Sequence, residues 1–424
     1  MTNSRAYETL SYLTDNIGPR LSGSRNAALA VKWTTDQFRA WDIPVRQEKI
    51  MVPRWVRGAE RARLVSHNDQ RIILTALGGS VATPAEGITA DVVEVGSFDQ
   101  LKTLGRAKVA GKIVFYNNPM DMELVRSGRA FEAYSKAVEF RSKGPDNASE
   151  YGAVAVVIRS VASASLRTPH TGGLSYERGK KIPAAAMTAE DAMLIHRLLS
   201  KGEKVRMNLV LTPRTLPDVE SANVVAEITG SENPEQIVLI GGHLDSWDLG
   251  TGAIDNGSGV AMVMETMRLL KELNIRPRRT VRCVLFMNEE NGLRGGKGYW
   301  KTHESEMGRH IAAIESDAGA AKPIGFVTTL TGPAIVQLES QLSVLARIGT
   351  LRFETRESTG ADTSLVVKGG VPGFGLRTEP LHYFDYHHSA ADTLDKIDPN
   401  DLAADAAAVA ALTYVIADSP RSLR

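Results

Sequence analysis

Five short segments of this chain place histidine or carboxylate side chains beside runs that predict strands or helices. In chain order these side chains are His243, Asp255, Glu290, Asp317 and His388. A mixture of imidazole and carboxylate favours zinc over magnesium or calcium, which prefer all-oxygen sites, although cobalt or manganese can substitute. The pattern therefore predicts a metal site assembled from five separate segments.

Each of these residues taken alone has a more ordinary interpretation. A histidine after a strand is usually a hydrogen-bonded structural residue, and an aspartate before a helix is usually its N-cap. Adjacent glutamates such as Glu289 and Glu290 usually lie in a solvated loop. As a set the residues differ, because acids gathered at neighbouring strand ends repel one another and lose solvation. A divalent metal ion removes that conflict.

The charges of the set indicate two zinc ions per chain. Asp255, Glu290 and Asp317 supply three negative charges, and one bridging hydroxide would bring a core with two Zn²⁺ to neutrality. We expect Asp255 to bridge the two ions. Asp245, which follows His243 by two residues, is placed to orient that imidazole from outside the metal shell.

Glu289 is the remaining carboxylate beside the predicted ligands. Consecutive residues point in different directions, so Glu290 can hold a metal ion while Glu289 faces a metal-bound water, whose pKa falls towards about 7. Glu289 would accept a proton as hydroxide attacks a carbonyl, and would then pass it to the leaving amine. The metal ions would stabilise the tetrahedral oxyanion. The set therefore indicates hydrolysis of a peptide bond.

The segments that position these residues alternate apolar strands with amphipathic helices from about residue 222 onward. This alternation predicts a mostly parallel mixed sheet flanked by helices, an α/β fold. In such sheets the functional residues collect at the carboxyl ends of the strands. The strands are predicted at 237–240, 280–287, 311–314 and 371–376, and the helices at 256–273, 295–306, 333–348, 361–368 and 399–418.

The part of the chain before residue 214 contains an N-terminal segment and a region of different texture. Helices are predicted at 5–16 and 25–41, and an extended segment at 43–52. From about 60 to 213, short β-rich runs alternate with glycine and proline, and we find no cluster of His, Asp and Glu. We therefore divide the chain into an N-terminal part of the catalytic domain, a β-rich insert and the catalytic domain itself, at 1–60, 61–213 and 214–424.

Composition excludes several classes of protein. A chain of 424 residues is too long for one ordinary core, which agrees with a domain plus an insert. Its 50 Lys and Arg nearly balance its 49 Asp and Glu, so there is no electrostatic reason to expect a nucleic acid or an anionic membrane as partner. No apolar run reaches the roughly 18 residues that span a bilayer. No leader is visible, so we expect a protein that is either cytoplasmic or has already lost its leader.

Several motifs together resemble those of the di-zinc aminopeptidase/carboxypeptidase family. The resemblance extends through nearly the whole chain, and its main motifs are GHLDSWD at 242–248, GAIDNGSG at 252–259, NEENG at 288–292, ESDAG at 315–319 and HHSAADT at 387–393. It implies that Glu289 is the base and that Asp255 bridges two zinc ions. It also implies the pairing of the other ligands: His243 and Asp317 on one zinc, Glu290 and His388 on the other. His387 is a competing choice for the last ligand, although the motif spacing favours His388.

The resemblance carries further expectations. It implies a zinc exopeptidase fold, a protease-associated type insert at 61–213 that helps shape the substrate cleft, and a homodimer. The implied substrates are dipeptides or short peptides with unblocked ends. Members are usually exported, so we expect a secreted or periplasmic protein whose leader has been removed. A free substrate carboxylate would need arginine or lysine, and the candidates are Arg294, Arg356 and Arg377.

Two other functions remain open on sequence alone. The first is a non-catalytic binding protein, as in relatives of this fold such as the transferrin receptor that lack the metal ligands. The presence of all five ligand positions and the base disfavours it. The second is a glutaminyl cyclase-like acyltransferase with one zinc ion, which a requirement for two zinc ions per chain would disfavour.

Overall fold

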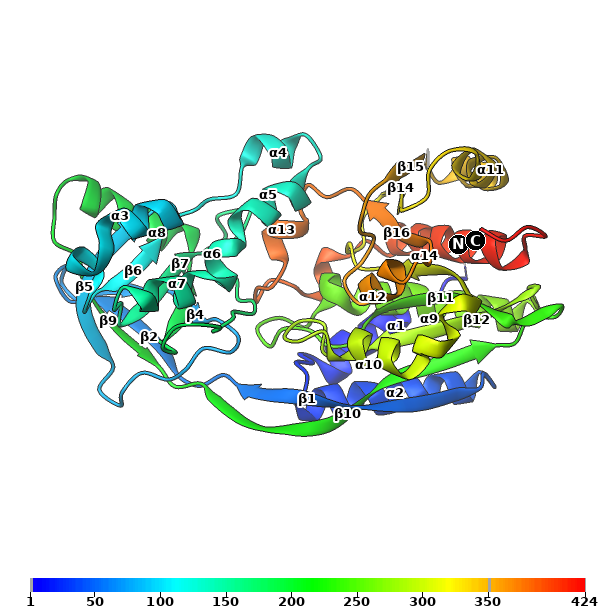
Figure 1. Cartoon of the computed structure of the whole chain (residues 1–424), viewed down its shortest axis with the longest axis horizontal. Helices are drawn as coiled ribbons and strands as arrows, with labels where there is room; N and C mark the ends of the chain where they lie inside the picture. Colours follow the sequence, from blue (N-terminus) through cyan, green and yellow to red (C-terminus); the bar gives the residue numbers. More distant parts are fainter. Residues whose placement is uncertain (1–2, 350–351, 424) are drawn as a thin grey trace. The chain divides into compact units, whose positions relative to one another are not determined.

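The strands that carry the predicted ligands pair into one mixed sheet (Figure 1). The computed structural model describes residues 3–349 and 352–423. Within these residues the sheet has the strand order β1-β10-β12-β11-β13-β16-β14-β15. The strands are β1 (Val45–Val56), β10 (Arg214–Ile228), β11 (Asn233–His243), β12 (Arg279–Phe286), β13 (His310–Glu315), β14 (Pro323–Thr328), β15 (Arg352–Thr355) and β16 (Gly373–Thr378).

The centre of this sheet is parallel and its flanks are mixed. β12, β11, β13 and β16 run parallel to one another, whereas β10 is antiparallel to β12 and β14 is antiparallel to β16. Every residue of β12 and of β13 is buried. Because successive side chains of a strand point to opposite faces, both faces of the sheet must be covered. The predicted mostly parallel mixed sheet flanked by helices is confirmed.

Helices provide that cover. On one side, α1 (Ala6–Ser11), α9 (Ser258–Glu272) and α14 (Pro399–Asp418) pack together and against β11 and β12. Elsewhere α10 (Arg294–His303) packs with α12 (Ser364–Lys368), and their side chains join a cluster of strand residues. The buried members of this cluster are Val225, Leu239, Val284, Phe286, Tyr299, Met307, Ala313, Val366 and Val371.

The remaining helices show where local pattern was and was not sufficient. The predicted helix 5–16 is α1 followed by a π-helix, η1 (Tyr12–Ile17), and the predicted helix 25–41 is α2 (Arg25–Ala40). The predicted helix 333–348 is broken into α11 (Pro333–Gln341) and a 3₁₀ turn, η4. η4 spans Ser343–Arg347, and the other short helical turns are η2 (Ala253–Gly257), η3 (Glu304–Arg309) and η5 (Leu394–Lys396).

The described chain divides into two compact units. The first unit contains Met1–Val52, Asp218–Glu379 and Asp392–Arg424, and the second contains Pro53–Pro217 and Pro380–Ala391. The chain crosses between the units within β1 and again within β10. The short segment Pro380–Ala391 groups with the second unit, whereas the sequence analysis assigned it to the catalytic domain. The nature of the insert remains a prediction.

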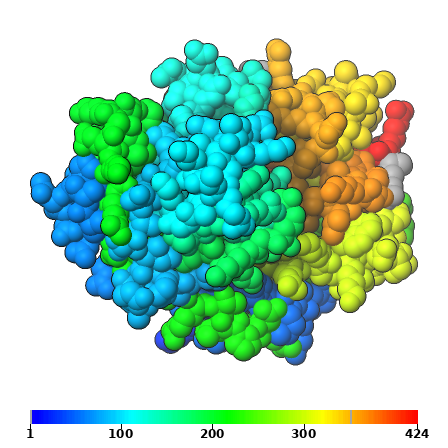
Figure 2. Space-filling view, turned by 60° about the vertical axis from the view of Figure 1, so that its left-hand side comes forward, coloured from blue at the N-terminus to red at the C-terminus, as the bar shows by residue number. Residues whose placement is uncertain are grey.

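The second unit has a mixed sheet of its own with the order β3-β2-β9-β5-β6-β7-β8-β4. Its helices α3 (Phe98–Val109) and α7 (Gly144–Glu150) contact each other. Figure 2 shows cyan residues near position 100 beside green-cyan residues nearer position 150. The strands are β2 (Glu60–Leu64), β3 (Gln70–Ile72), β4 (Leu74–Ala76), β5 (Ile88–Val95), β6 (Ile113–Tyr116), β7 (Ala155–Arg159), β8 (Ala184–Met187) and β9 (Arg206–Leu211). The helices are α3 (Phe98–Val109), α4 (Met122–Arg126), α5 (Ala130–Ala137), α6 (Glu139–Ser142), α7 (Gly144–Glu150), α8 (Ala189–Ser200) and α13 (Tyr383–Tyr386).

The closing helix α14 is long and apolar enough to cross a membrane by length and composition alone. In the structure 56% of its most apolar stretch of 18 residues is buried, and the helix packs against α9. Its apolar residues therefore serve the core of the first unit. A buried core helix can be as long and as apolar as a membrane-spanning helix.

Asp405 is an acidic residue inside that helix. It is fully buried, and the backbone N–H of Ala321 is the hydrogen-bond donor that lowers its pKa. Burial, with Asp401 adding to it, raises the pKa of Asp405 well above its ordinary value of 3.8. Below that ordinary value the carboxyl is protonated in both folded and unfolded chains. Above it only the unfolded chain ionises, so folding stability falls as pH rises, by roughly 1 kcal/mol per pH unit, until the raised pKa is passed.

We therefore expect Asp405→Asn to stabilise the protein. The gain in Tm over wild type should grow as the pH is raised from about 4 to about 8. Thermal unfolding at several pH values measures it. Asp91→Asn, a change at an exposed residue of β5, serves as the control and should leave the pH profile unchanged. Equal Tm for Asp405→Asn and wild type across the whole range would contradict the buried, protonated state.

Candidate metal centre

The register of the parallel strands brings three predicted site segments to one edge of the first sheet. His243, the last residue of β11, pairs with Phe286, the last residue of β12. On the other side of β11, pairing with β13 extends to Glu315 at the end of that strand. The residues that follow, 287–290 and 316–317, therefore begin where His243 lies. This is the strand-end convergence that the sequence predicted for His243, Glu290 and Asp317.

Asp255 reaches the same place from the segment before α9. It is not the N-cap of that helix, because α9 has Gly257 as N-cap and no side-chain capping bond. Instead Asp255 Oδ1 lies 3.1 Å from His243 Nε2, and Asp317 Oδ1 lies 3.4 Å from the same nitrogen. The donor atoms of His243, Asp255 and Asp317 all lie within 4.8 Å of one another. Three of the five predicted ligands thus form one cluster.

The chemistry of this cluster fits a divalent metal ion. The His243 side chain is only 1% exposed. Burial lowers its pKa, but Asp317 and Asp255 more than reverse that effect and hold the pKa well above 6.5. The site therefore demands positive charge at Nε2, and a divalent cation between one imidazole and two carboxylates meets the same demand.

Asp245 contacts His243 through its backbone carbonyl, and the segment Asn288–Glu289 through its carboxylate. Its backbone carbonyl accepts a hydrogen bond from His243 Nδ1 at 3.0 Å, which leaves Nε2 as the metal-binding nitrogen. Its carboxylate stays 3.8 Å from Nδ1. That carboxylate accepts hydrogen bonds from the backbone N–H groups of Asn288 at 2.8 Å and of Glu289 at 3.1 Å. Asp245 therefore ties the imidazole to the segment that carries the predicted base.

Glu289 and Glu290 follow β12 in a short turn. Asn288, which opens the turn, has a φ of 73°, in the left-handed region that asparagine tolerates better than most residues. Burial raises the pKa of Glu289 well above 4.5, and Glu290, Asp317 and Asp255 add to the effect while His243 opposes it. A raised carboxyl pKa in a site of this kind is typical of a general base. Glu290 is not one of the three clustered donors among the described residues, and its role as ligand remains a prediction.

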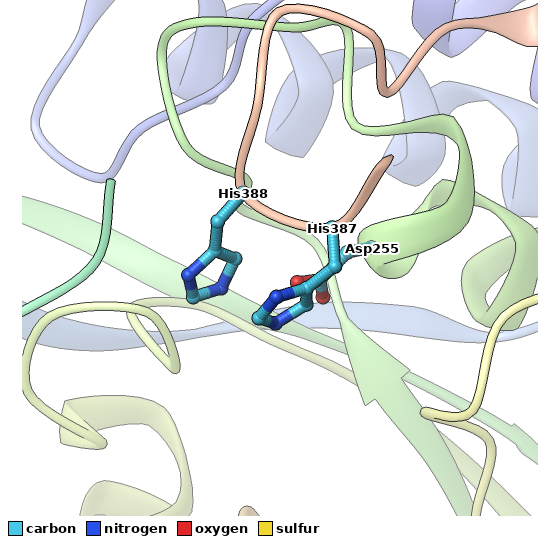
Figure 3. Close-up of side chains that lie close together, drawn as sticks. All are labelled: Asp255, His387 and His388. Carbon is cyan, nitrogen blue, oxygen red and sulfur yellow. The ribbon is translucent and has the colours of Figure 1, made fainter. Parts of the chain in front are cut away.

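His387 and His388 lie after α13 in the second unit. Their rings stack with centroids 3.6 Å apart (Figure 3). His388 Nδ1 donates to the carbonyl of Thr171 at 3.3 Å, which leaves Nε2 for a metal ion. His388 also has a φ of 59°, a costly conformation for a non-glycine residue that is often found at functional sites. Because His388 belongs to the second unit and Glu290 to the first, their shared zinc remains a prediction.

Asp392 supports the segment that carries Asp255. Its carboxylate oxygens accept hydrogen bonds from the backbone N–H groups of Ile254 at 2.7 Å and of Asp255 at 3.2 Å. Burial raises the pKa of Asp392 to about 7, and the nearby Asp255 charge adds to this. Asp392 belongs to the motif HHSAADT at 387–393, but the sequence indicates no role for it. Its position in that motif was the one signal available.

Arg20 holds the same segment from the other side. It is fully buried and donates to the carbonyls of Leu244 at 3.0 Å, Thr251 at 2.6 Å and Gly252 at 3.0 Å. These carbonyls lie in the loop between His243 and Asp255. Arg20 therefore fixes the backbone between two of the clustered donors, a role that nothing in its local sequence indicates.

Glu315, the last residue of β13, and Asp362 are two further buried acidic residues near the strand ends. The Glu315 carboxylate accepts hydrogen bonds from the backbone N–H groups of 361–363 and from the Thr363 hydroxyl, at 2.7 to 3.2 Å. Asp362 is buried, and neither of its carboxylate oxygens has a partner among the described residues. Burial, followed by the charges of Glu315 and Glu289, raises the Asp362 pKa well above its ordinary value. The sequence analysis assigned neither residue.

An α/β sheet whose strand ends gather histidine and carboxylates around one point is an arrangement that fits a metallopeptidase. Comparison with known proteins places the chain within that class. The model of peptidase family M28 matches residues 223–413. Carboxypeptidase Q of Bos taurus is 39% identical over 416 residues, which cover 98% of this chain and 85% of that protein. The chain belongs to peptidase family M28 and is a metallo-exopeptidase.

Solved structures agree with this assignment. The crystal structure of a peptidase M28 precursor from Shewanella amazonensis matches with a TM-score of 0.95 and 38% identity, covering 100% of this chain and 95% of that one. A zinc aminopeptidase from Bacillus subtilis matches with a TM-score of 0.73 over 99% of this chain and 96% of its own. At 21% identity this second likeness bears on the fold alone. The family resemblance and the exopeptidase class predicted from sequence are confirmed.

Proposed function

We propose that this protein is a di-zinc exopeptidase that hydrolyses dipeptides or short peptides with unblocked ends. The observation that carries the proposal is the cluster of His243, Asp255 and Asp317, whose donor atoms lie within 4.8 Å of one another. The relatives named carboxypeptidase and aminopeptidase support an exopeptidase. The similar fold of the zinc aminopeptidase from Bacillus subtilis supports zinc as the metal.

In this proposal five residues hold two zinc ions. His243 and Asp317 would hold one ion and Glu290 and His388 the other, with Asp255 shared between them. Bound zinc would supply Lewis acidity, lowering the pKa of water and polarising the substrate carbonyl. Two hydrogen bonds support the assignment of the histidine atoms, because His243 and His388 each use Nδ1 on a backbone carbonyl and keep Nε2 for the metal.

The protein's own residues then move the proton and hold the geometry. Glu289 accepts a proton from the attacking water and returns it to the leaving amine. Asp245 holds the Glu289 backbone at 3.1 Å, so the base keeps its place beside His243. Asp392 and Arg20 hold the loop that ends in Asp255. These hydrogen bonds hold the loop before Asp255 and the turn that carries Glu289 in place beside the strand ends.

A panel of dipeptides with free or blocked ends, assayed with metal counting, tests the proposal. We expect cleavage of unblocked dipeptides, loss of activity after chelation, and recovery that saturates at about two zinc ions per chain. Magnesium added to the chelated protein is the control and should not restore activity, because the donor set includes imidazole. Cleavage of N-blocked dipeptides would contradict the preference for unblocked ends. Saturation at one zinc ion would instead favour the glutaminyl cyclase-like alternative.

The proposal also covers assembly and location. We propose a homodimer with peptides as its substrates, with neither nucleic acid nor a membrane as partner, and export from the cytoplasm. These statements rest on the family resemblance and on the balanced charge of the chain. Sedimentation of the purified protein tests the dimer, and fractionation of the source cells tests the location. A monomer at all concentrations, or a protein confined to the cytoplasm, would contradict them.

A further inference from the structure

Arg141 in α6 is a buried arginine without an acidic partner. It is only 8% exposed, and no carboxylate among the described residues lies within ion-pair distance of it. Other buried arginines are satisfied: Arg268 and Arg282 pair with glutamates, and Arg20 and Arg279 donate to carbonyls. Arg141 Nε, by contrast, has no acceptor among the described residues. A desolvated cation with an unused donor is costly unless an anion comes to it.

The surroundings of Arg141 hold the guanidinium in a defined place. Its Cζ lies 5.6 Å from the centre of the Tyr134 ring. On another side is Gly172, which has a φ of 144° and where a Cβ would come within 2.3 Å of Cζ. Only glycine leaves room for the guanidinium there. The arginine therefore sits in a built cradle rather than on a solvated surface.

The same arginine touches the predicted metal ligand His388. Arg141 Nη1 donates to the carbonyl of Thr171 at 3.3 Å, and His388 Nδ1 donates to that same carbonyl at 3.3 Å. Nη1 and Nδ1 are 3.4 Å apart. Arg141 therefore lies on the Nδ1 side of the His388 ring, beside a predicted metal ligand.

We propose that Arg141 binds the terminal carboxylate of the peptide substrate, which deepens the proposed function and rests on it. A carboxylate is the anion that every unblocked peptide brings, and arginine binds it with charge-assisted hydrogen bonds. Recognition of this carboxylate would make the enzyme specific for the carboxyl end of its substrate.

The three arginines that the sequence suggested for this role are poorer candidates. Arg356 and Arg377 both pair with Glu354 at 2.8 Å, so each already has an acidic partner. Arg294 is half exposed, and its contact with Asp218 is at 4.0 Å. None combines burial, an unused donor and contact with a predicted metal ligand. Arg141 combines all three.

The test compares a zinc-loaded full chain acting on an unblocked dipeptide and on the same dipeptide with a C-terminal amide. We expect wild type to prefer the free acid by about 30-fold in kcat/KM, through KM, as loss of a charge-assisted hydrogen bond implies. Arg141→Met should remove that preference by lowering kcat/KM for the acid while leaving the amide unchanged. Arg141→Lys should retain part of it. Arg129→Met, at an exposed arginine beside α5, is the matched control and should keep the wild-type ratio.

Three other outcomes are informative. Equal cleavage of acid and amide by wild type overturns the inference while the proposed function stands, and this comparison needs no variant to fold. An equal loss on both substrates in Arg141→Met, together with loss of zinc, overturns it in favour of a structural support for His388. If wild type cleaves neither peptide after zinc loading, the proposed function itself fails and the inference with it.

Discussion

Glu289→Gln should retain both zinc ions and lose most of its turnover. Glutamine has the size and backbone contacts of glutamate but cannot accept a proton from water. Loss of a positioned general base lowers kcat by about 10²–10⁴-fold. The hydrogen bond from the backbone N–H of residue 289 to Asp245 does not depend on the side chain, so the turn should persist. Measurement of kcat on an unblocked dipeptide, with zinc counted in the same sample, checks this result.

The matched control for this variant is Glu304→Gln. Glu304 is exposed at the start of η3, and its replacement should leave both kcat and zinc content at wild-type values. If Glu289→Gln loses zinc, then Glu289 is a metal ligand and Glu290 becomes the candidate for the general base. Full activity in Glu289→Gln would remove Glu289 from the reaction altogether.

Asp255→Ala should release both zinc ions. Asp255 Oδ1 lies 3.1 Å from His243 Nε2, at the centre of the donor cluster, and a bridging carboxylate contributes to both sites at once. Removal of an outer-shell partner of a metal ligand costs about 10–100-fold in affinity, and removal of a shared ligand should cost more at both ions. Zinc per chain after dialysis against a weak chelator, and a competition titration with a chromogenic chelator, measure the effect.

Asp15→Ala, a change at an exposed aspartate of η1, is the control for general effects of losing an acid and should keep two zinc ions. Loss of a single ion in Asp255→Ala would assign Asp255 to one site only. A variant that keeps its full zinc would exclude Asp255 from the metal centre. The apo form of each variant should be compared by thermal unfolding, since metal binding contributes to folding stability.

Much of the first sheet could be predicted from the sequence. β12 and β13 lie within a residue or two of their predicted positions because each is a short apolar run buried on both faces. β14 was missed although five of its six residues are buried. β10 and β15 were missed for the opposite reason. β10 is long, contains Pro217 and is largely exposed in its first half, and β15 is an edge strand without a fully buried residue. Such strands are specified by the neighbours they pair with, which a local pattern does not contain.

Part of the candidate site could likewise be predicted from the sequence, and part of it required the structure. The residue types and their strand-end positions were readable from the chain, because zinc chemistry needs imidazole and carboxylate and because parallel strands end at one edge. The structure adds what each side chain contacts. It shows His243, Asp255 and Asp317 converging, and it shows that the Asp245 carboxylate holds the base segment rather than the imidazole.

The sequence by itself determined the family, the α/β sheet and the set of chemically competent residues, since these follow from local periodicity and from motifs a few residues long. Only the tertiary structure decided how the site is supported. Arg20 and Asp392 come from opposite ends of the chain to hold one loop, and Arg141 lies beside His388 without an acidic partner among the described residues. These roles depend on burial and on hydrogen-bond partners that are distant in sequence, and both exist only once the chain has folded.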